Sequence, residues 1–280
     1  MTMKYCMRFG ILVIALLLSG TGFGQRKPKI KGNRSVITVD KPLNEFAHLS
    51  ITDGLEVRLE PGNKEAVRIE ADDNLIDILR FEQDGDTLNI STFYTITGSK
   101  KLDLTLTYQD LRTIRVAQGS AVAEQTIEVN QLDLMLMEGS ETSLTISAGL
   151  VKLQMSGNAT SDLNIASDSL HITLADQTKS FIYSTDSAMD ITLSGRATAV
   201  LEGTGKSLTL SMTDNASLKA EGMEVGSIMA FLNTSSQARI NALTQLSYEG
   251  RDKSKLYVYG QPKIEILGFY DTAELHKSSQ

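Results

Sequence analysis

Between residues 121 and 258, apolar and polar residues alternate in short segments that recur every 19 positions along the chain. The clearest apolar column contains Leu134, Leu153, Ile172, Ile191 and Leu210. Similar columns stand two residues before it, beginning at Leu132, and two residues after it, beginning at Leu136. Alternation with period two is typical of a strand with one buried face, and it does not fit the i, i+3, i+4 spacing of an amphipathic helix.

Two further columns mark the turns of this repeat. One is rich in residues that adopt turn conformations, and its members are Glu138, Gly157, Asp176, Gly195, Asp214, Asn233 and Asp252. The column two residues later holds small side chains at Ala121, Ser140, Ala159, Thr178, Ala197, Ala216, Ser235 and Ser254. A strand, a turn, a second strand and another turn in each repeat predict one coil of a parallel β-helix, or β-solenoid, in which like residues stack over like. About seven or eight coils at this spacing would form a rod roughly 35 Å long.

The columns weaken near their C-terminal end. If the period stays constant, Ser227, Arg239 and Gly250 fall at positions that are apolar in the earlier coils. These breaks indicate either a distortion, cap or binding surface in the last two coils, or a coil whose length changes there.

Residues 1–24 have the features of a secretory signal peptide. Lys4 and Arg8 precede an apolar run from Phe9 to Leu18, and small residues follow before Gln25. The run is too short for a transmembrane helix, which needs about 20 apolar residues.

Cleavage would remove Cys6, the single cysteine, and would leave 25 basic and 34 acidic residues, a net charge of −9. We therefore expect an exported protein without disulfides, located in the periplasm, at the outer membrane or outside the cell, with no transmembrane segment in the mature chain. Nucleic acid is excluded as a partner because phosphate binding needs clustered basic residues.

The remainder of the chain divides around the repeat. Residues 25–35 are a short basic stretch that we expect to be a flexible leader, and residues 36–110 an irregular N-terminal β region that opens or caps the solenoid. Its predicted strands are Val36 to Val39, Ala47 to Ile51, Leu55 to Leu59, Ala66 to Glu70, Thr87 to Ser91 and Leu102 to Thr107, with a short helix capped by Asp73 or Asn74. Residues 111–268 form the repeat region, including a last strand from Ile264 to Leu267, and residues 269–280 a loose polar tail.

Several segments resemble the DUF2807 family. These are Phe46 to Ile51 followed by Thr52-Asp53-Gly54, the Leu59 to Gly62 turn, Ala71 to Leu75, Gly85 to Ile90, Gly119-Ser120-Ala121, and Tyr259 to Pro262. The family is described as an autotransporter adhesin head, or GIN, domain, and it is common in exported proteins of Bacteroidetes. The resemblance covers residues 36–266 and implies a right-handed parallel β-helix. It implies no activity and carries over no functional residues.

One group of residues is compatible with glycoside or polysaccharide cleavage. If the period stays constant, Tyr183, Glu202 and Glu221 share one outward column, which would place the two carboxylates about 5 Å apart, the separation found in retaining glycosidases. A solvated acidic face explains the same pair. The chain also lacks tryptophan, the side chain best suited to support a sugar ring. We therefore expect no catalytic residue, and a carbohydrate-active enzyme of β-helix architecture remains the alternative.

Metal and cofactor motifs are not evident in the sequence. Of the three histidines, His48 lies near the amino terminus, His171 in the repeat and His276 in the polar tail, so nothing places two together. The Asp72-Asp73-Asn74 cluster lacks the spacing of a calcium-binding loop, so a helix cap is the simpler explanation for it. We expect no cofactor-binding residues, no metal ligands and no cofactor.

The outward columns offer a different role. Thr173, Thr192 and Ser211 form a row of hydroxyl side chains that a rigid rod would present to a repetitive partner, either a glycan or an envelope or surface protein. We therefore expect a non-catalytic, adhesin-like or structural protein of the cell envelope. Self-assembly through the ends of the rod is a third possibility, because the sequence leaves the oligomeric state open.

Overall fold

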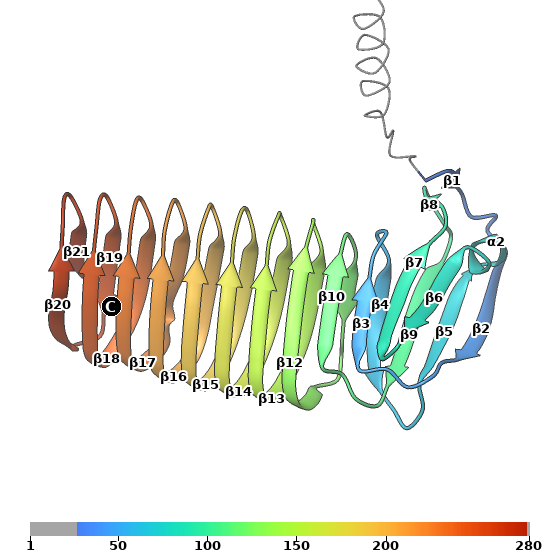
Figure 1. Cartoon of the computed structure of the whole chain (residues 1–280), viewed down its shortest axis with the longest axis horizontal. Helices are drawn as coiled ribbons and strands as arrows, with labels where there is room; N and C mark the ends of the chain where they lie inside the picture. The colour runs from blue at the N-terminus through green and yellow to red at the C-terminus, as the bar shows by residue number, and fades with distance from the viewer. Residues whose placement is uncertain (1–26, 279–280) are drawn as a thin grey trace, which may run out of the picture.

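The computed structural model describes residues 27–278, which fold almost entirely as β-structure in one elongated molecule (Figure 1). The expected signal peptide, residues 1–24, lies outside the described residues. Among residues 27–278, no helix has the length and apolar character needed to cross a lipid bilayer.

The central part is a β-solenoid of about nine turns. It contains seven long parallel strands, which are β12 (Ile127–Met137), β13 (Glu141–Met155), β14 (Thr160–Leu174), β15 (Lys179–Leu193), β16 (Thr198–Met212), β17 (Ser217–Leu232) and β18 (Gln237–Gly250). From β12 to β16 each residue pairs with the residue 19 positions later. The predicted fold class and coil length are confirmed.

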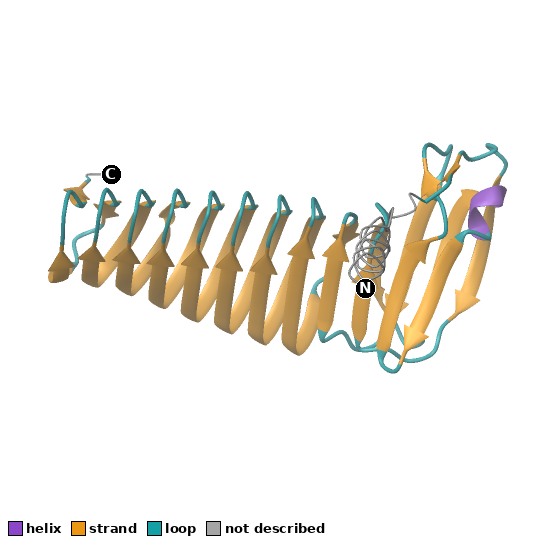
Figure 2. Cartoon of the chain, turned by 45° about the horizontal axis from the view of Figure 1, so that its top comes forward, coloured by secondary structure: helices purple, strands orange, loops and turns teal. Residues whose placement is uncertain are grey.

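Each of the strands β13 to β18 bends once and contributes to two sheets. In β14, for example, residues 160–167 and residues 169–174 pair with the neighbouring coils, and Asp168 at the bend is left out of the ladder. We call the sheet built from the first halves sheet 1 and the sheet built from the second halves sheet 2. Figure 2 shows the strands curving between the two layers at one edge, while loops join successive coils at the other edge.

Stacked aliphatic side chains fill the space between the sheets. Leu134, Leu153, Ile172, Ile191 and Leu210 follow one another in register, and each is at most 2% exposed. Burying one such side chain contributes about 1.5–3 kcal/mol relative to leaving it in water. The predicted aliphatic columns are therefore the interior of the solenoid through β16.

The turns between coils use a left-handed backbone conformation. Positive φ angles recur at Glu138, Gly157, Asp176, Gly195, Asp214, Thr234 and Asp252. Glycine and aspartate tolerate this region better than most residues. The small residues that follow are buried, which confirms the two turn columns except in one coil.

That exception is the coil of β17, where the period changes. A bulge follows Val200, so that Glu202 pairs with Gly222 and Leu208 with Ile228, and the offset between paired residues grows by one. Between β17 and β18 the offset on sheet 2 is one shorter than in the regular coils, and Ile228 pairs with Leu246. The assumption of a constant period is wrong here, and the predicted breaks mark a change in coil length.

The change reverses the orientation of several residues. Ile228, Ala230, Leu232 and Ile240 are buried, whereas Met229 is 44% exposed and Phe231 and Arg239 are partly exposed. Thr234 and Ser236 take the turn positions that we assigned to Asn233 and Ser235. Side chains alternate between the two faces of a strand, so a shift of one residue exchanges inside for outside.

The N-terminal region extends both sheets. Sheet 1 continues through β11 (Ser120–Val122), β4 (Glu56–Pro61), β9 (Leu102–Tyr108), β5 (Ala66–Asp72) and β2 (Val36–Pro42). Sheet 2 continues through β10 (Thr113–Ala117), β3 (His48–Ile51), β7 (Thr87–Thr92) and β6 (Leu79–Asp84). The pairs β9–β5, β5–β2 and β7–β6 are antiparallel, unlike the solenoid. The expected irregular N-terminal β region is therefore a partly antiparallel extension of the same two sheets.

The basic leader is partly structured. β1 (Lys29–Ile30) pairs with β8 (Thr95–Ile96), and the amide of Gly32 donates a hydrogen bond to the carbonyl of Gly98. The prediction of a flexible leader is therefore wrong for these residues.

The Asp72-Asp73-Asn74 cluster holds the leader in place. Asn74 Oδ1 accepts a hydrogen bond from the Asn33 amide at 3.0 Å, and Asn74 Nδ2 donates one to the Lys31 carbonyl at 3.0 Å. The expected short helix exists as α2 (Asp73–Ile76), but its N-cap is Asp72, which makes no capping hydrogen bond through its side chain. The predicted cap at Asp73 or Asn74 is therefore wrong.

Three short strands complete the other end, namely β19 (Lys255–Tyr259), β20 (Lys263–Phe269) and β21 (Glu274–Lys277). β20 contains the expected strand from Ile264 to Leu267. β21 pairs with β19, so the tail is ordered where we expected a loose segment.

Candidate functional site

A row of outward-facing residues crosses five coils of sheet 2. Thr173 pairs with Thr192 and Thr192 with Ser211, as the sequence predicts. The row continues through Phe231 to Glu249. We call these five residues the sheet 2 row.

Four of the five residues of this row border a shallow hollow of about 230 Å³. The residues around it are Thr192, Leu193, Ser211, Met212, Thr213, Phe231, Leu232, Asn233, Glu249 and Arg251. Two of the three hydroxyl residues predicted from sequence are among them. Thr173 lies one coil further along the row and does not line the hollow.

Phe231 supplies the aromatic side chain of the hollow. A constant period assigns it to the interior, and the extra residue in β17 turns it outward. The break in the aliphatic columns at Ser227 is the sequence signal for this change, although it does not identify Phe231.

Charged residues form one side of the hollow. Arg251 Nε donates a hydrogen bond to Glu249 Oε1 at 2.8 Å, and the Arg251 guanidinium lies 4.6 Å from the centre of the Tyr270 ring. The hydrogen bond and charge of Glu249 raise the pKa of Arg251 above its ordinary value, so the guanidinium stays protonated. The hollow thus combines an aromatic ring, hydroxyl groups and an ion pair.

The sheet 1 candidates do not form the predicted pair of carboxylates. Tyr183 and Glu202 are in register, but Glu202 pairs with Gly222. The Glu202 side chain lies over that glycine, since a Cβ on Gly222 would be 3.2 Å from Glu202 Cγ. Glu221 Oε1 instead lies 4.0 Å from an Arg239 guanidinium nitrogen. The single column proposed for Tyr183, Glu202 and Glu221 is therefore wrong, because the β17 bulge takes Glu221 out of register with Glu202.

A buried carboxylate sits at the bend of β15, where sequence analysis predicted nothing. Asp186 is 7% exposed and accepts hydrogen bonds from the Ser167 amide at 2.8 Å, the Ser167 hydroxyl at 2.5 Å and the Ser184 hydroxyl. Burial raises its pKa, although the serine hydrogen bonds act in the opposite direction. The two bonds from Ser167 join neighbouring coils, which indicates a structural role.

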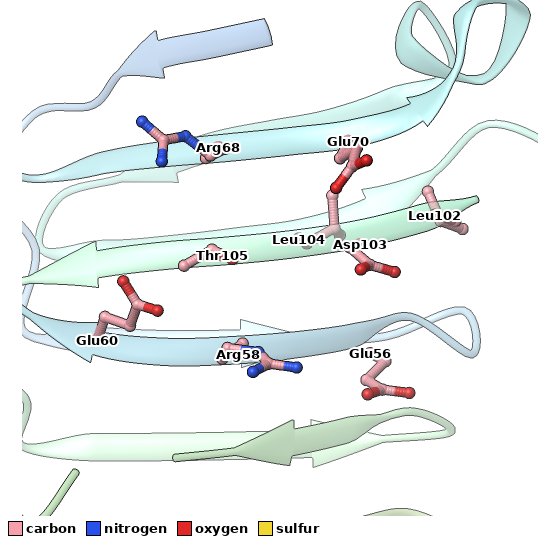
Figure 3. A pocket seen from close by; sticks show the side chains of 9 residues that line it. All are labelled: Glu56, Arg58, Glu60, Arg68, Glu70, Leu102, Asp103, Leu104 and Thr105. Atoms are coloured by element: carbon pink, nitrogen blue, oxygen red, sulfur yellow. The ribbon is translucent and has the colours of Figure 1, made fainter. Parts of the chain in front are cut away.

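A second hollow, of about 310 Å³, lies on the outer surface of the N-terminal part of sheet 1. Figure 3 shows Arg58 between Glu56 and Glu60 on β4, Asp103 and Thr105 on β9, and Arg68 and Glu70 on β5. Several charges are already paired: Arg68 with Asp40, Arg58 with Glu124, and Asp103 with Lys101 at 2.5 Å. Such exposed pairs are typical of a solvated face. Within residues 27–278, no three His, Cys, Asp or Glu side chains gather in a geometry suited to a metal ion.

The fold and this surface define a β-solenoid whose outer face on sheet 2 carries a hollow lined by Phe231 and polar side chains. The family model described as "Putative auto-transporter adhesin, head GIN domain" matches residues 45–182 and 156–262. The chain therefore belongs to the DUF2807 family.

Known structures share this architecture at low sequence identity. A "putative adhesin" from Parabacteroides merdae has a TM-score of 0.69 and 14% identity, covering 90% of this chain and 99% of its own. A "putative adhesin" from Parabacteroides distasonis has a TM-score of 0.63 and 14% identity, covering 89% of this chain and 100% of its own. A "putative lipid binding protein" from the same species has the same TM-score and identity, covering 89% and 99%. At this identity the likeness shows the fold alone. A search of curated protein sequences finds no match.

Proposed function

We propose that the protein is an exported, non-catalytic, adhesin-like protein that binds a glycan chain along sheet 2. The observation that carries the proposal is the hollow at Phe231, which places an aromatic ring beside Ser211, Thr192 and the Glu249–Arg251 pair. Ligand sites commonly combine apolar surface with a few fixed polar groups. A sugar ring offers both kinds of surface, because its C–H groups suit an aromatic face and its hydroxyls exchange hydrogen bonds with charged and hydroxyl side chains.

The size of the hollow favours part of a long chain over a small ligand. About 230 Å³ is below the usual 300–1,000 Å³ of pockets that enclose a small molecule. The sheet 2 row extends from the hollow toward Thr173, so a linear partner would find further hydroxyl groups along the rod. A surface protein is the other kind of partner for this face, and the binding experiment separates the two.

Glycan arrays and envelope fractions would test the proposed binding. We expect the Phe231→Ser variant to bind at least tenfold more weakly, since aromatic anchors supply much of the energy of such contacts. Phe181→Ser is the matched control, because Phe181 is exposed on the opposite sheet, outside the hollow. Equal loss in both variants would contradict the proposed site. Binding to envelope proteins but to no glycan would contradict the ligand class.

The non-catalytic role rests on the family description and on the register of β17, which does not stack Glu221 on Glu202. The carbohydrate-active alternative predicts that Glu202→Gln and Glu221→Gln abolish polysaccharide cleavage. Cleavage that depends on either carboxylate would overturn our assignment.

Export is inferred from residues 1–24 and from the adhesin description of the family. We expect the mature protein to begin near Gln25 and to reside in the periplasm, at the outer membrane or outside the cell. N-terminal sequencing, fractionation and surface protease treatment would test this. A cytoplasmic protein that retains residues 1–24 would contradict it.

A further inference from the structure

The last coil leaves the end of the solenoid open. β20 ends sheet 2 and pairs with β18, while β21 ends sheet 1 and pairs with β19. Within residues 27–278, no strand pairs with the outer edges of β20 and β21, which lie at the end of the rod away from the N-terminal region (Figure 1). Unpaired edges of this kind are templates for pairing with another chain.

The interior of the solenoid is also open at this end. Ile264 stacks on Leu246, and Ile266 stacks on Tyr248, so both continue rows of the core. Leu246 and Tyr248 are fully buried, but Ile264 is 37% exposed and Ile266 is 47% exposed. Leu267, Phe269 and Tyr270 add exposed apolar surface beside them. A further layer of strands would bury these side chains as the preceding coils are buried.

The opposite end is protected. The outermost strand of sheet 1, β2, carries Asp40, Lys41 and Pro42. That of sheet 2, β6, carries Arg80, Glu82 and Asp84. Proline and charge both discourage edge pairing. The neighbouring α2 buries Leu75, and Ile78 just after the helix is buried as well. An association of C-terminal end with N-terminal end is therefore disfavoured, and so is an open filament.

We propose that a second copy of this chain covers the open end, giving a twofold-symmetric, end-to-end dimer. Only another pair of strand edges can complete both sheets and cover the apolar rows between them at once. A lipid surface would cover the apolar side chains but would leave the edge N–H and C=O groups without partners, which is costly. A single extended peptide would complete only one of the two sheets.

Side-chain charge on β20 is consistent with self-pairing. Twofold symmetry brings β20 against its own copy in antiparallel orientation. In a register centred on Ile264, Lys263 of each copy faces Glu265 of the other, and the two Ile264 side chains meet in the core. Two favourable charge pairs and the contact between the two Ile264 side chains then support the same arrangement.

Sedimentation or light scattering of the purified protein across a concentration range would test the dimer. We expect the wild-type protein to dimerise and Ile266→Lys to raise the dissociation constant at least tenfold. Phe181→Lys is the control, since Phe181 is comparably exposed, at 40%, on the flat face of sheet 1. A wild-type monomer at every concentration would overturn the proposal. An unchanged dimer in Ile266→Lys, or equal loss in Phe181→Lys, would overturn it as well.

Hydrogen exchange gives a readout that needs no substitution. Amides of β20 and β21 should exchange more slowly as the protein concentration rises, while those of β2 should not change. Protection of β2 instead would overturn the end-to-end geometry. Binding to phosphatidylcholine vesicles tests the alternative that lipid covers the open end. A monomer that binds these vesicles through Ile266 would overturn the dimer. These outcomes are independent of glycan binding at Phe231.

Discussion

The backbone of Gly203 lies directly against the carbonyl group of Ser184 in the preceding coil. Gly203 has a φ of +114°, and a Cβ at this position would overlap the Ser184 oxygen. Neighbouring coils pair in register here, so neither backbone can move without disturbing the ladder. Glycine is therefore required at this position by both conformation and space.

We expect Gly203→Ala to lower the free energy of unfolding by about 3 kcal/mol or more, because backbone strain and overlap add. Gly85→Ala should cost about 1 kcal/mol, since Gly85 has a φ of +56° but open space around it. Gly98→Ala should be nearly neutral, as nothing lies within 4 Å of its added Cβ. Urea denaturation of the three variants would check the order. If the Gly203→Ala protein were as stable as the Gly98→Ala protein, the close contact between Gly203 and the Ser184 carbonyl would be refuted.

A second prediction concerns the aspartates at the turns. Asp176 Oδ2 accepts a hydrogen bond from the Gly157 amide at 2.8 Å, and Asp214 Oδ2 accepts one from the Gly195 amide at 3.0 Å. These bonds join each aspartate to the glycine one coil earlier and explain why the two residue types alternate. Asp176→Ala should cost about 1–2 kcal/mol, because a hydrogen bond to a charged group and a residue suited to positive φ are both lost. Asp162→Ala, at an exposed strand position, is the control. An equal loss of stability in the Asp176 and Asp162 variants would contradict the stabilising role of these aspartate–glycine hydrogen bonds.

The repeat was predictable because stacked coils require the same kind of residue at each position. The six strands expected between Val36 and Thr107 are all present, and so is the short helix at Asp73. The missed strand β6 pairs antiparallel with β7, in a region where no repeat constrains the sequence. The leader strand β1 was missed because its order depends on Asn33 and Asn74, which are distant in sequence.

The proposed binding surface was only partly predictable. Thr192 and Ser211 follow from the period, whereas Phe231 depends on one extra residue in β17. Breaks in the apolar columns do not show whether a residue has been inserted or the coil is distorted. The same insertion takes Glu221 out of register with Glu202, so a single bulge accounts for both the missed aromatic residue and the incorrect stacked pair.

The corrected register makes a third prediction. Ile228 is 3% exposed and pairs with Leu208 and Leu246 in the core, whereas Ser227 is partly exposed. Ile228→Ala should lower the free energy of unfolding by about 2–5 kcal/mol, and Ser227→Ala should change it by less than about 0.5 kcal/mol. An uninterrupted period predicts the reverse, with Ser227 inside. Thermal or urea denaturation of both variants decides between the two registers.

A fourth prediction concerns Asp186 and pH. Burial raises the pKa of this carboxyl group in the folded protein above its value in the unfolded chain. The folded state then holds the proton more tightly, so the stability that Asp186 contributes is fully present at acidic pH and is lost as pH rises from about 4 through the raised pKa. Asp186→Asn cannot ionise and should not lose stability in this way. The wild-type protein should therefore lose stability relative to Asp186→Asn between pH 4 and pH 7 in urea titrations.

The comparison depends on the difference between two proteins, because other groups in the chain also titrate in this range. Asp168→Asn controls for the removal of one negative charge, since Asp168 is an exposed carboxylate at the bend of the neighbouring coil. A relative stability that moves in the opposite direction would mean that the hydrogen bonds from Ser167 and Ser184 outweigh burial. Asp186 would then remain ionised and stabilise the fold through the hydrogen bonds that it accepts from Ser167 and Ser184. Its replacement would lower stability most at neutral pH.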